Sequence, residues 1–280
     1  MCSSDLKKMK DKKEKKVPDR KEDRGDMTRL EGRNPIAEAL AAGRSINRIY
    51  LLEGARQGRA GKDLADLAQA CRQQGALVSY VSRARLDAMA ESHGHQGIIA
   101  EVAPFNYRDL DQILAACQAA DRPPFLLLLD QIQDAHNLGS ILRIADGAGV
   151  DAVVITRRRS VPLNAAVAKA SAGAVEHVPL CRVNNLTQTI LMLKEEGFWV
   201  HGTAAGQGLS YKEADYKGKL ALVIGSEGFG MSQKLADHCD FLLSIPLKGK
   251  VNSLNAAVAC GVICFEASSQ RQEPAACPPA

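Results

Sequence analysis

The feature that most constrains the fold is Phe125–Leu129, a run of five residues that reads Phe-Leu-Leu-Leu-Leu. A strand with one face in water alternates apolar and polar side chains, whereas a strand covered by helices on both faces is apolar throughout. The run therefore predicts a central strand of a parallel sheet. Because parallel neighbours are joined by crossover helices, we expect an α/β domain around it.

Further strand-like and helical patterns alternate on the C-terminal side of this run and define a domain over residues 122–269. The predicted strands are 125–129, 150–155, 198–203, 220–224 and 241–245, and the predicted helices are 138–148, 164–172, 186–196 and 253–268. This order predicts an α/β domain with a parallel sheet.

A smaller α/β unit is predicted over residues 28–104. Its strands are 47–52, 76–81 and 97–102, and its helices are 35–40, 62–74 and 83–90. Asn34 is the predicted cap of the first helix, with Pro35 at the first helical position. Residues 105–121 form a linker with one helix, and Pro123-Pro124 marks the boundary to the second domain.

The two ends of the chain carry little that could fold. Residues 1–27 are rich in lysine and predict a disordered basic tail, and residues 270–280 predict a loose tail rich in proline and alanine. The first 25 residues alone account for the net charge of +4, so the charge of the body does not indicate nucleic-acid binding. With no apolar segment of about 18 residues, a cytoplasmic protein without a membrane span is expected.

No metal site is predicted. The chain has eight cysteines, but none forms a C-x-x-C pair. Cys260 and Cys264 lie one helical turn apart, which is more typical of two buried apolar positions than of a metal or redox pair. His93 and His95 lack a cluster of further ligands.

Polar residues and glycines gather in segments 130–143, 223–231 and 245–255, where predicted strands end or helices begin. The carboxyl ends of parallel strands are where ligands bind in open sheets. Each segment alone also has a structural explanation, because Asn137 and Ser253 are natural helix caps and Gly225–Gly230 would serve as a turn. For a single segment, the two interpretations weigh about equally.

The glycines also raise a nicotinamide-dependent enzyme as an alternative. Gly225, Gly228 and Gly230 follow an apolar strand, but their G-x-x-G-x-G spacing reverses the dinucleotide-binding fingerprint. Glu227 inside the turn would repel a pyrophosphate, so this alternative is disfavoured.

Taken together, the three segments resemble the three signature motifs of the SpoU/TrmH family of RNA ribose methyltransferases, in order and spacing. The matching residues are Asn137, Gly139, Ser140 and Arg143, then Gly225, Glu227, Gly228 and Gly230, and then Ile245, Pro246, Gly249, Ser253, Leu254 and Asn255. Residues 31–40 and 95–97 are similar to the subgroup with a ribosomal-protein-like substrate-binding domain, which includes the guanosine 2′-O-methyltransferase of 23S ribosomal RNA.

The resemblance, which covers roughly residues 28–268, implies a catalytic domain with a trefoil knot and a homodimer whose active site uses both chains. It implies S-adenosylmethionine as cofactor and RNA as substrate. The residues implied are Thr203, Gly225, Ile245 and Leu254 for the cofactor, Asn137, Arg143, Glu227, Ser253 and Asn255 for catalysis, and Arg33 and Asn34 for RNA.

Arg143 is expected to act as a cation, because a guanidinium keeps its proton at neutral pH. It would stabilise the developing alkoxide and position a phosphate, while Glu227 would anchor it or receive the proton through water. Two alternatives stay open. One is methylation of transfer RNA, and the other is a non-catalytic protein that binds RNA or assists ribosome assembly.

Overall fold

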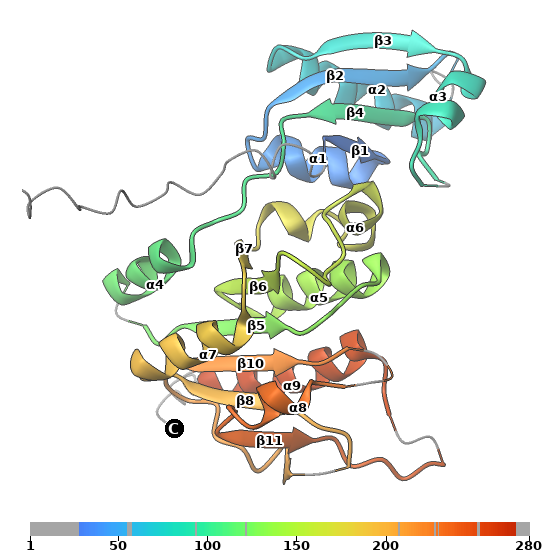
Figure 1. Cartoon of the computed structure of the whole chain (residues 1–280). Helices are drawn as coiled ribbons and strands as arrows, with labels where there is room; N and C mark the ends of the chain where they lie inside the picture. The colour runs from blue at the N-terminus through green and yellow to red at the C-terminus, as the bar shows by residue number, and fades with distance from the viewer. Residues whose placement is uncertain are drawn as a thin grey trace, which may run out of the picture.

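The computed structural model describes residues 28–54, 58–92, 94–120, 122–206, 208–226, 228, 230–250 and 253–272, without the side chains of residues 58–60. Two domains, each with its own sheet, lie one above the other along the long axis of the molecule (Figure 1). The predicted tail over residues 1–27 lies outside the described residues.

The N-terminal domain is a four-stranded sheet with three helices. Its elements are β1 (Arg29–Glu31), α1 (Arg33–Ala41), β2 (Ile46–Leu52), α2 (Gly58–Gln73), β3 (Leu77–Val81), α3 (Arg83–Met89) and β4 (Ile98–Val102). The strand order is β1-β4-β2-β3, with β2 and β3 parallel and the other pairs antiparallel. The short strand β1 is absent from the sequence-based prediction.

The C-terminal domain follows α4 (Leu110–Ala119) and contains a seven-stranded sheet of order β7-β6-β5-β10-β8-β11-β9. All its strand pairs are parallel. Its strands are β5 (Phe125–Leu129), β6 (Ala152–Thr156), β7 (Leu180–Val183), β8 (Trp199–Thr203), β9 (Leu209–Ser210), β10 (Leu220–Ile224) and β11 (Phe241–Ser244). Its helices are α5 (Ala135–Ala148), α6 (Ala165–Ala170), the 3-10 turn η1 (Ala174–Glu176), α7 (Leu186–Glu195), α8 (Gln233–Ala236) and α9 (Ala256–Arg271). The predicted α/β parallel-sheet class is confirmed.

The apolar run at β5 is buried on both faces, which explains its composition. Phe125, Leu127 and Leu129 pack on the side of α5 and α9, whereas Leu126 and Leu128 pack on the side of α4 and α7. Burial of a side chain of this size stabilises the fold by about 1.5–3 kcal/mol. The central strand thus holds both helical layers of the domain together.

Several helices begin at residues other than the predicted ones. Helix α1 starts at Arg33 after Gly32, so Asn34 lies inside the first turn and is not its cap. Gln96 Oε1 accepts the Arg33 backbone N–H at 3.2 Å in place of a cap side chain. Asp134, and not Asn137, caps α5 through the Asn137 backbone N–H at 2.8 Å.

The last helix lies three residues further along the chain than predicted. Asn255, and not Ser253, caps α9 by accepting the backbone N–H groups of Ala257 and Val258. Gln270 and Arg271, assigned by the sequence to a loose tail, belong to α9, because the Arg271 guanidinium donates to the carbonyls of Pro123, Tyr216 and Gly218. The trefoil knot does not follow from strand order alone and stays a prediction.

A buried ion pair joins the two domains. Arg44 Nη1, three residues after the end of α1, lies 2.7 Å from Glu176 Oε1 in η1, and both side chains are less than a tenth exposed. Arg44 also donates from Nε to the Ala103 carbonyl at 3.0 Å and lies over the ring of Phe105. The linker is therefore fixed against both domains.

Candidate active site

The three polar segments of the sequence meet at one edge of the large sheet. Strand order places β5, β10, β8 and β11 side by side, and all four run in the same direction. Asp130, Thr203, Gly225 and Ile245 are therefore neighbours at the carboxyl edge, although up to 115 positions separate them in the sequence. Such an edge is the usual ligand site of a parallel sheet.

Thr203 and Gly225 are in direct contact at this edge. The Thr203 hydroxyl donates to the Val223 carbonyl at 3.2 Å and accepts the Gly225 backbone N–H at 3.4 Å. A Cβ atom at Gly225 would overlap the backbone of Gly230 and Met231. Only glycine permits this close approach of two chain segments.

The loop after Gly225 is closed by paired backbone hydrogen bonds. Ser226 and Gly230 exchange N–H···O=C bonds at 3.0 Å in both directions, and the Ser226 hydroxyl also donates to the Gly230 carbonyl. Glu227, predicted to be catalytic, is in this loop but lies outside the described residues.

Asp130 was not among the predicted site residues, yet it connects two of the three segments. Its carboxylate is buried and accepts the Ser232 backbone N–H at 3.0 Å, while its own N–H donates to the Ile224 carbonyl at 2.9 Å. An aspartate directly after an all-apolar strand was the available signal, since a buried carboxylate needs partners.

Asn137 and Asn255 are brought together from the first and third segments. Asn255 Nδ2 donates to Asn137 Oδ1 at 2.9 Å. This orientation is fixed because Asn255 Oδ1 accepts two N–H groups of α9, so only its amino group can face Asn137. The Nδ2 group of Asn137 has no acceptor within the part of the chain that the structure describes, and it remains as a donor.

Helices α5 and α9 lie side by side and run in the same direction. Asn137 contacts Asn255 at one end, Ile144 faces Gly261 in the middle, and Gly147 faces Phe265 at the other end. Arg143 lies on the exposed side of α5, next to Ile144 and one turn before Gly147. No contact joins Arg143 to the Asn137–Asn255 pair in the described residues.

The remaining predicted side chains are partly or fully open to solvent. Ile245 is partly buried against the main core, whereas Leu254 is 38% exposed and Ser253 is exposed. Aliphatic side chains half-open to solvent at a strand edge suit the flat face of a heterocycle.

The predicted RNA-binding residues lie in the other domain, away from this edge. Arg33 Nη1 pairs with Asp63 Oδ2 of α2 at 3.2 Å, and Asn34 is exposed. Both belong to the first turn of α1, which the Gln96 side chain contacts.

The thiols near the sheet are not reactive groups. Burial raises the pKa of Cys181 to about 12 and that of Cys239 to about 12, so both stay protonated at neutral pH. Among the described residues, no cluster of three or more His, Cys, Asp or Glu side chains could hold a metal ion. No helix in those same ranges is long and apolar enough to span a membrane.

Comparison with known proteins gives the site its context. Residues 124–265 match the model of the SpoU rRNA Methylase family, and residues 29–108 match the model described as RNA 2′-O ribose methyltransferase substrate binding. A putative TrmH family tRNA/rRNA methyltransferase of Bacillus subtilis is 42% identical over 240 residues, 86% of this chain and 94% of the relative. One of Staphylococcus haemolyticus is 43% identical over 242 residues, 86% and 95% of the two chains.

Solved structures agree with the fold. The SpoU methyltransferase AviRb from Streptomyces viridochromogenes, in complex with AdoMet, superposes with a TM-score of 0.71 at 24% identity, over 87% of this chain and 89% of that one. A putative RNA methyltransferase of the TrmH family from Porphyromonas gingivalis gives a TM-score of 0.68 at 25% identity, over 85% and 88% of the two chains.

A substrate-binding domain joined to a parallel-sheet domain with polar segments at its carboxyl edge defines an RNA methyltransferase. The chain belongs to the SpoU/TrmH family, which confirms the resemblance found in the sequence.

Proposed function

We propose that this chain transfers a methyl group from S-adenosylmethionine to a ribose 2′-oxygen of RNA, in a guanosine of 23S rRNA. The observation that carries the proposal is the meeting of the three polar segments at one carboxyl edge, in a chain whose other domain matches a substrate-binding model for 2′-O ribose methyltransferases. The names of the relatives include tRNA, so a transfer RNA is the second candidate substrate.

The carboxyl edge fits an adenosyl group. The backbone at Gly225 approaches without a side chain, Thr203 supplies a hydroxyl beside it, and Ile245 and Leu254 offer aliphatic surface. When bound, S-adenosylmethionine supplies a methyl group already activated by its sulfonium. Thr203, Gly225, Ile245 and Leu254 would hold the cofactor, so that much of the acceleration comes from alignment with the acceptor hydroxyl.

Asn137 and Asn255 would position the acceptor ribose. The Asn137 Nδ2 donor is held in place by the bond between the two amides. A preorganised donor of this kind stabilises an oxygen on which negative charge develops, typically by about 3–4 kcal/mol. Ser253, exposed just before the cap of α9, would donate to the same ribose or its phosphate.

Arg143 would supply the cation for the developing 2′-alkoxide or for an adjacent phosphate. In this reaction a new O–CH3 bond forms, the S–CH3 bond breaks, and the hydroxyl proton leaves. Because a guanidinium keeps its own proton at neutral pH, Arg143 would not take that proton. We propose Glu227 as the anchor of Arg143 or as the acceptor of the proton through water.

The exposed face beside Arg143 supports the proposal that two copies form a homodimer. Val258 and Phe265 of α9 are both 52% exposed and lie on one face with Gly261 between them. An apolar stripe with this three- and four-residue spacing is typical of helix pairing. Arg143 borders this stripe, so it would lie close to the active site of the partner subunit.

The function is tested by transfer from S-[methyl-³H]adenosylmethionine to total RNA that lacks its own 2′-O-methyl marks, followed by sizing and nucleotide mapping. We expect label at a guanosine ribose of 23S rRNA, and a loss of at least about 100-fold with Arg143→Lys or Glu227→Ala. Label in tRNA would identify transfer RNA, the second candidate, as the substrate. Cofactor binding with no label in any RNA would contradict the methyltransferase proposal in favour of a binding or assembly protein.

Full activity of Arg143→Lys would contradict a role for the planar guanidinium, since lysine keeps the charge and loses the fork. Light scattering tests the homodimer separately. Phe265→Glu should give a monomer, whereas Trp199→Glu, which changes an aromatic residue that is 54% exposed elsewhere on the domain, should leave the dimer intact.

A further inference from the structure

The N-terminal domain contains a cavity of about 630 Å³ that none of the site residues above explains. It opens at the carboxyl ends of the parallel strands β2 and β3, between α2, α3 and the loop that leads into β4. Its lining is partly aliphatic and partly polar, and the residues that matter here are Leu52, Leu64, Arg83, Asp87, His95 and Gln96. A volume of this size lies within the range of about 300–1,000 Å³ that small-molecule sites occupy.

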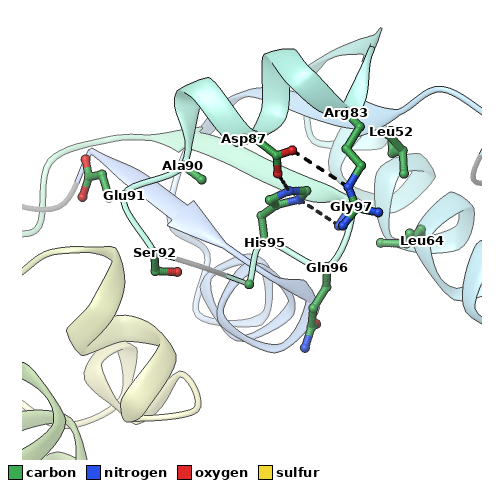
Figure 2. A pocket seen from close by; sticks show the side chains of 11 residues that line it. Leu52, Leu64, Arg83, Asp87, Ala90, Glu91, Ser92, His95, Gln96 and Gly97 are labelled. Carbon is green, nitrogen blue, oxygen red and sulfur yellow. Dashed lines mark hydrogen bonds and ion pairs between the residues drawn. The ribbon is translucent and has the colours of Figure 1, made fainter.

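The polar side of the cavity is fixed by a short chain of hydrogen bonds, which Figure 2 shows from close by. The Gly97 backbone N–H donates to His95 Nδ1 at 3.0 Å, so this nitrogen has no proton. His95 Nε2 therefore carries the proton and donates it to Asp87 Oδ1 at 2.9 Å. The second Asp87 oxygen lies 3.9 Å from Arg83 Nε, which is ion-pair distance but too long for a hydrogen bond, so this oxygen keeps capacity to accept from a ligand.

The loop that frames the cavity is held before any ligand binds. The buried Glu31 carboxylate accepts the backbone N–H groups of Glu91 and Ser92 and the Ser92 hydroxyl. Gln96 adopts a left-handed backbone with φ of 52°, a conformation that costs a non-glycine residue about 1 kcal/mol or more. Strain of this kind persists where the surroundings enforce it, and it is frequent at ligand sites.

Two cationic side chains lie near the cavity. The Arg83 side chain is 78% exposed at its rim. From the other domain, Lys169 of α6 reaches Gly94 in the same loop. Figure 1 shows this loop on the side of the molecule toward which β5 and β10 also point. One RNA strand could therefore reach both the cavity and the carboxyl edge of the large sheet.

We propose that this cavity holds an unpaired nucleotide of the RNA substrate. Proteins read single-stranded RNA by placing splayed-out bases against arginine, histidine or apolar surfaces and by hydrogen bonding to their Watson–Crick edges. Leu52 and Leu64 supply the apolar wall, and Asp87 accepts N–H groups of the base edge. Arg83 and Lys169 contact the flanking phosphates. This inference rests on the proposed function, because it assigns part of the RNA to the substrate-binding domain.

The Asp87→Asn variant distinguishes base recognition by the Asp87 carboxylate from general electrostatic attraction between the protein and RNA. Asparagine still accepts from His95 Nε2 and preserves the fold, but it removes a negative charge close to the RNA. General electrostatics alone would then strengthen RNA binding. Reading of a base edge by the carboxylate requires the reverse, a loss of about tenfold in affinity, which is typical of a lost hydrogen bond to a charged group. Asp66→Asn, on the exposed face of α2 outside the cavity, is the matched control.

The probe is in vitro transcribed 23S rRNA that contains 4-thiouridine, with affinity measured by filter binding to the full chain and contacts mapped by photocrosslinking. We expect crosslinks on the tryptic peptide of residues 86–108, weaker binding for Asp87→Asn and no loss for Asp66→Asn. Equal or tighter binding by Asp87→Asn, or crosslinks confined to other peptides, would overturn the proposal.

RNA binding by the Arg83→Gln variant is a second test, at an exposed side chain whose loss should not affect folding. This substitution should weaken binding more than Arg72→Gln, an exposed arginine at the far end of α2, and equal losses would count against the cavity. Methyl transfer by the wild type is scored separately. Crosslinks on residues 86–108 without methyl transfer would contradict the proposed function but support RNA binding in the cavity. Methyl transfer with crosslinks only elsewhere would support the proposed function and contradict RNA binding in the cavity.

Discussion

Asn255 Nδ2 donates to Asn137 Oδ1 at 2.9 Å across 118 positions of sequence, and this bond ties the start of α9 to the start of α5. The same Asn255 side chain caps α9 through its oxygen. One residue therefore stabilises a helix and orients the amide that we propose to face the ribose.

The two roles of Asn255 are separable by substitution. Asn255→Ala should lower stability by about 1 kcal/mol through loss of the cap and should also lower methyl transfer. Asn255→Asp should restore the stability, since aspartate caps a helix well, but not the activity, because it cannot donate to Asn137. Urea unfolding and transfer assays on both variants test this. Recovery of activity in Asn255→Asp would show that only the cap matters.

Gly225 should tolerate no side chain. A Cβ atom there would overlap the backbone of Gly230 and Met231, so Gly225→Ala should displace the loop and weaken S-adenosylmethionine binding measured by calorimetry. Gly249→Ala, where a Cβ meets nothing within 4 Å, should leave the melting temperature unchanged. Equal melting temperatures and unchanged cofactor affinity for Gly225→Ala would show that the loop can move without cost.

The ion pair between the domains should contribute strongly to stability. Glu176→Gln removes the carboxylate charge that neutralises the buried Arg44 cation, a change that typically costs about 3–5 kcal/mol. The exposed pair Arg33–Asp63 is the control, and Asp63→Asn should cost less than about 1 kcal/mol. Chemical denaturation measures both. A similarly small loss of stability in both variants would mean that water reaches Arg44.

His201 should make stability depend on pH. Burial lowers the pKa of His201, against the opposing effect of Asp240 and Asp215, and its Nδ1 has no hydrogen-bond partner among the residues that the structure describes. The unfolded chain binds a proton at His201 more readily than the folded chain does. The stability that neutral His201 contributes is therefore fully present above about pH 6.5, and it is lost as the pH falls toward the pKa of His201 in the folded protein.

His201→Phe keeps a ring against Tyr216 and Phe241 and removes the titration. As the pH falls from about 7 to about 5, the stability of this variant relative to wild type should rise. The rise should be about 1.4 kcal/mol for each unit by which folding lowers the pKa of His201. Thermal melts across this range test it, and parallel pH profiles for the two proteins would argue against an uncharged buried His201.

The sequence by itself determined the fold class, the order of most elements and the family. Phe125–Leu129 is apolar because helices cover both of its faces, and this physical condition is visible in five consecutive residues. The longer helices and the other central strands of the large sheet were similarly recognisable. The short strands β1, β7 and β9 were not, since two to four residues carry no clear periodicity.

Only the tertiary structure decided which side chains meet. Asn137 is a residue type that often caps helices, but Asp134 caps α5 instead. The Asn137 side-chain amide is therefore available to accept the hydrogen bond from Asn255. Asp130 and His95 acquire partners from segments that local patterns cannot connect. Strand order and helix register fix such contacts through packing over long sequence distances, and a local pattern contains no information about that packing.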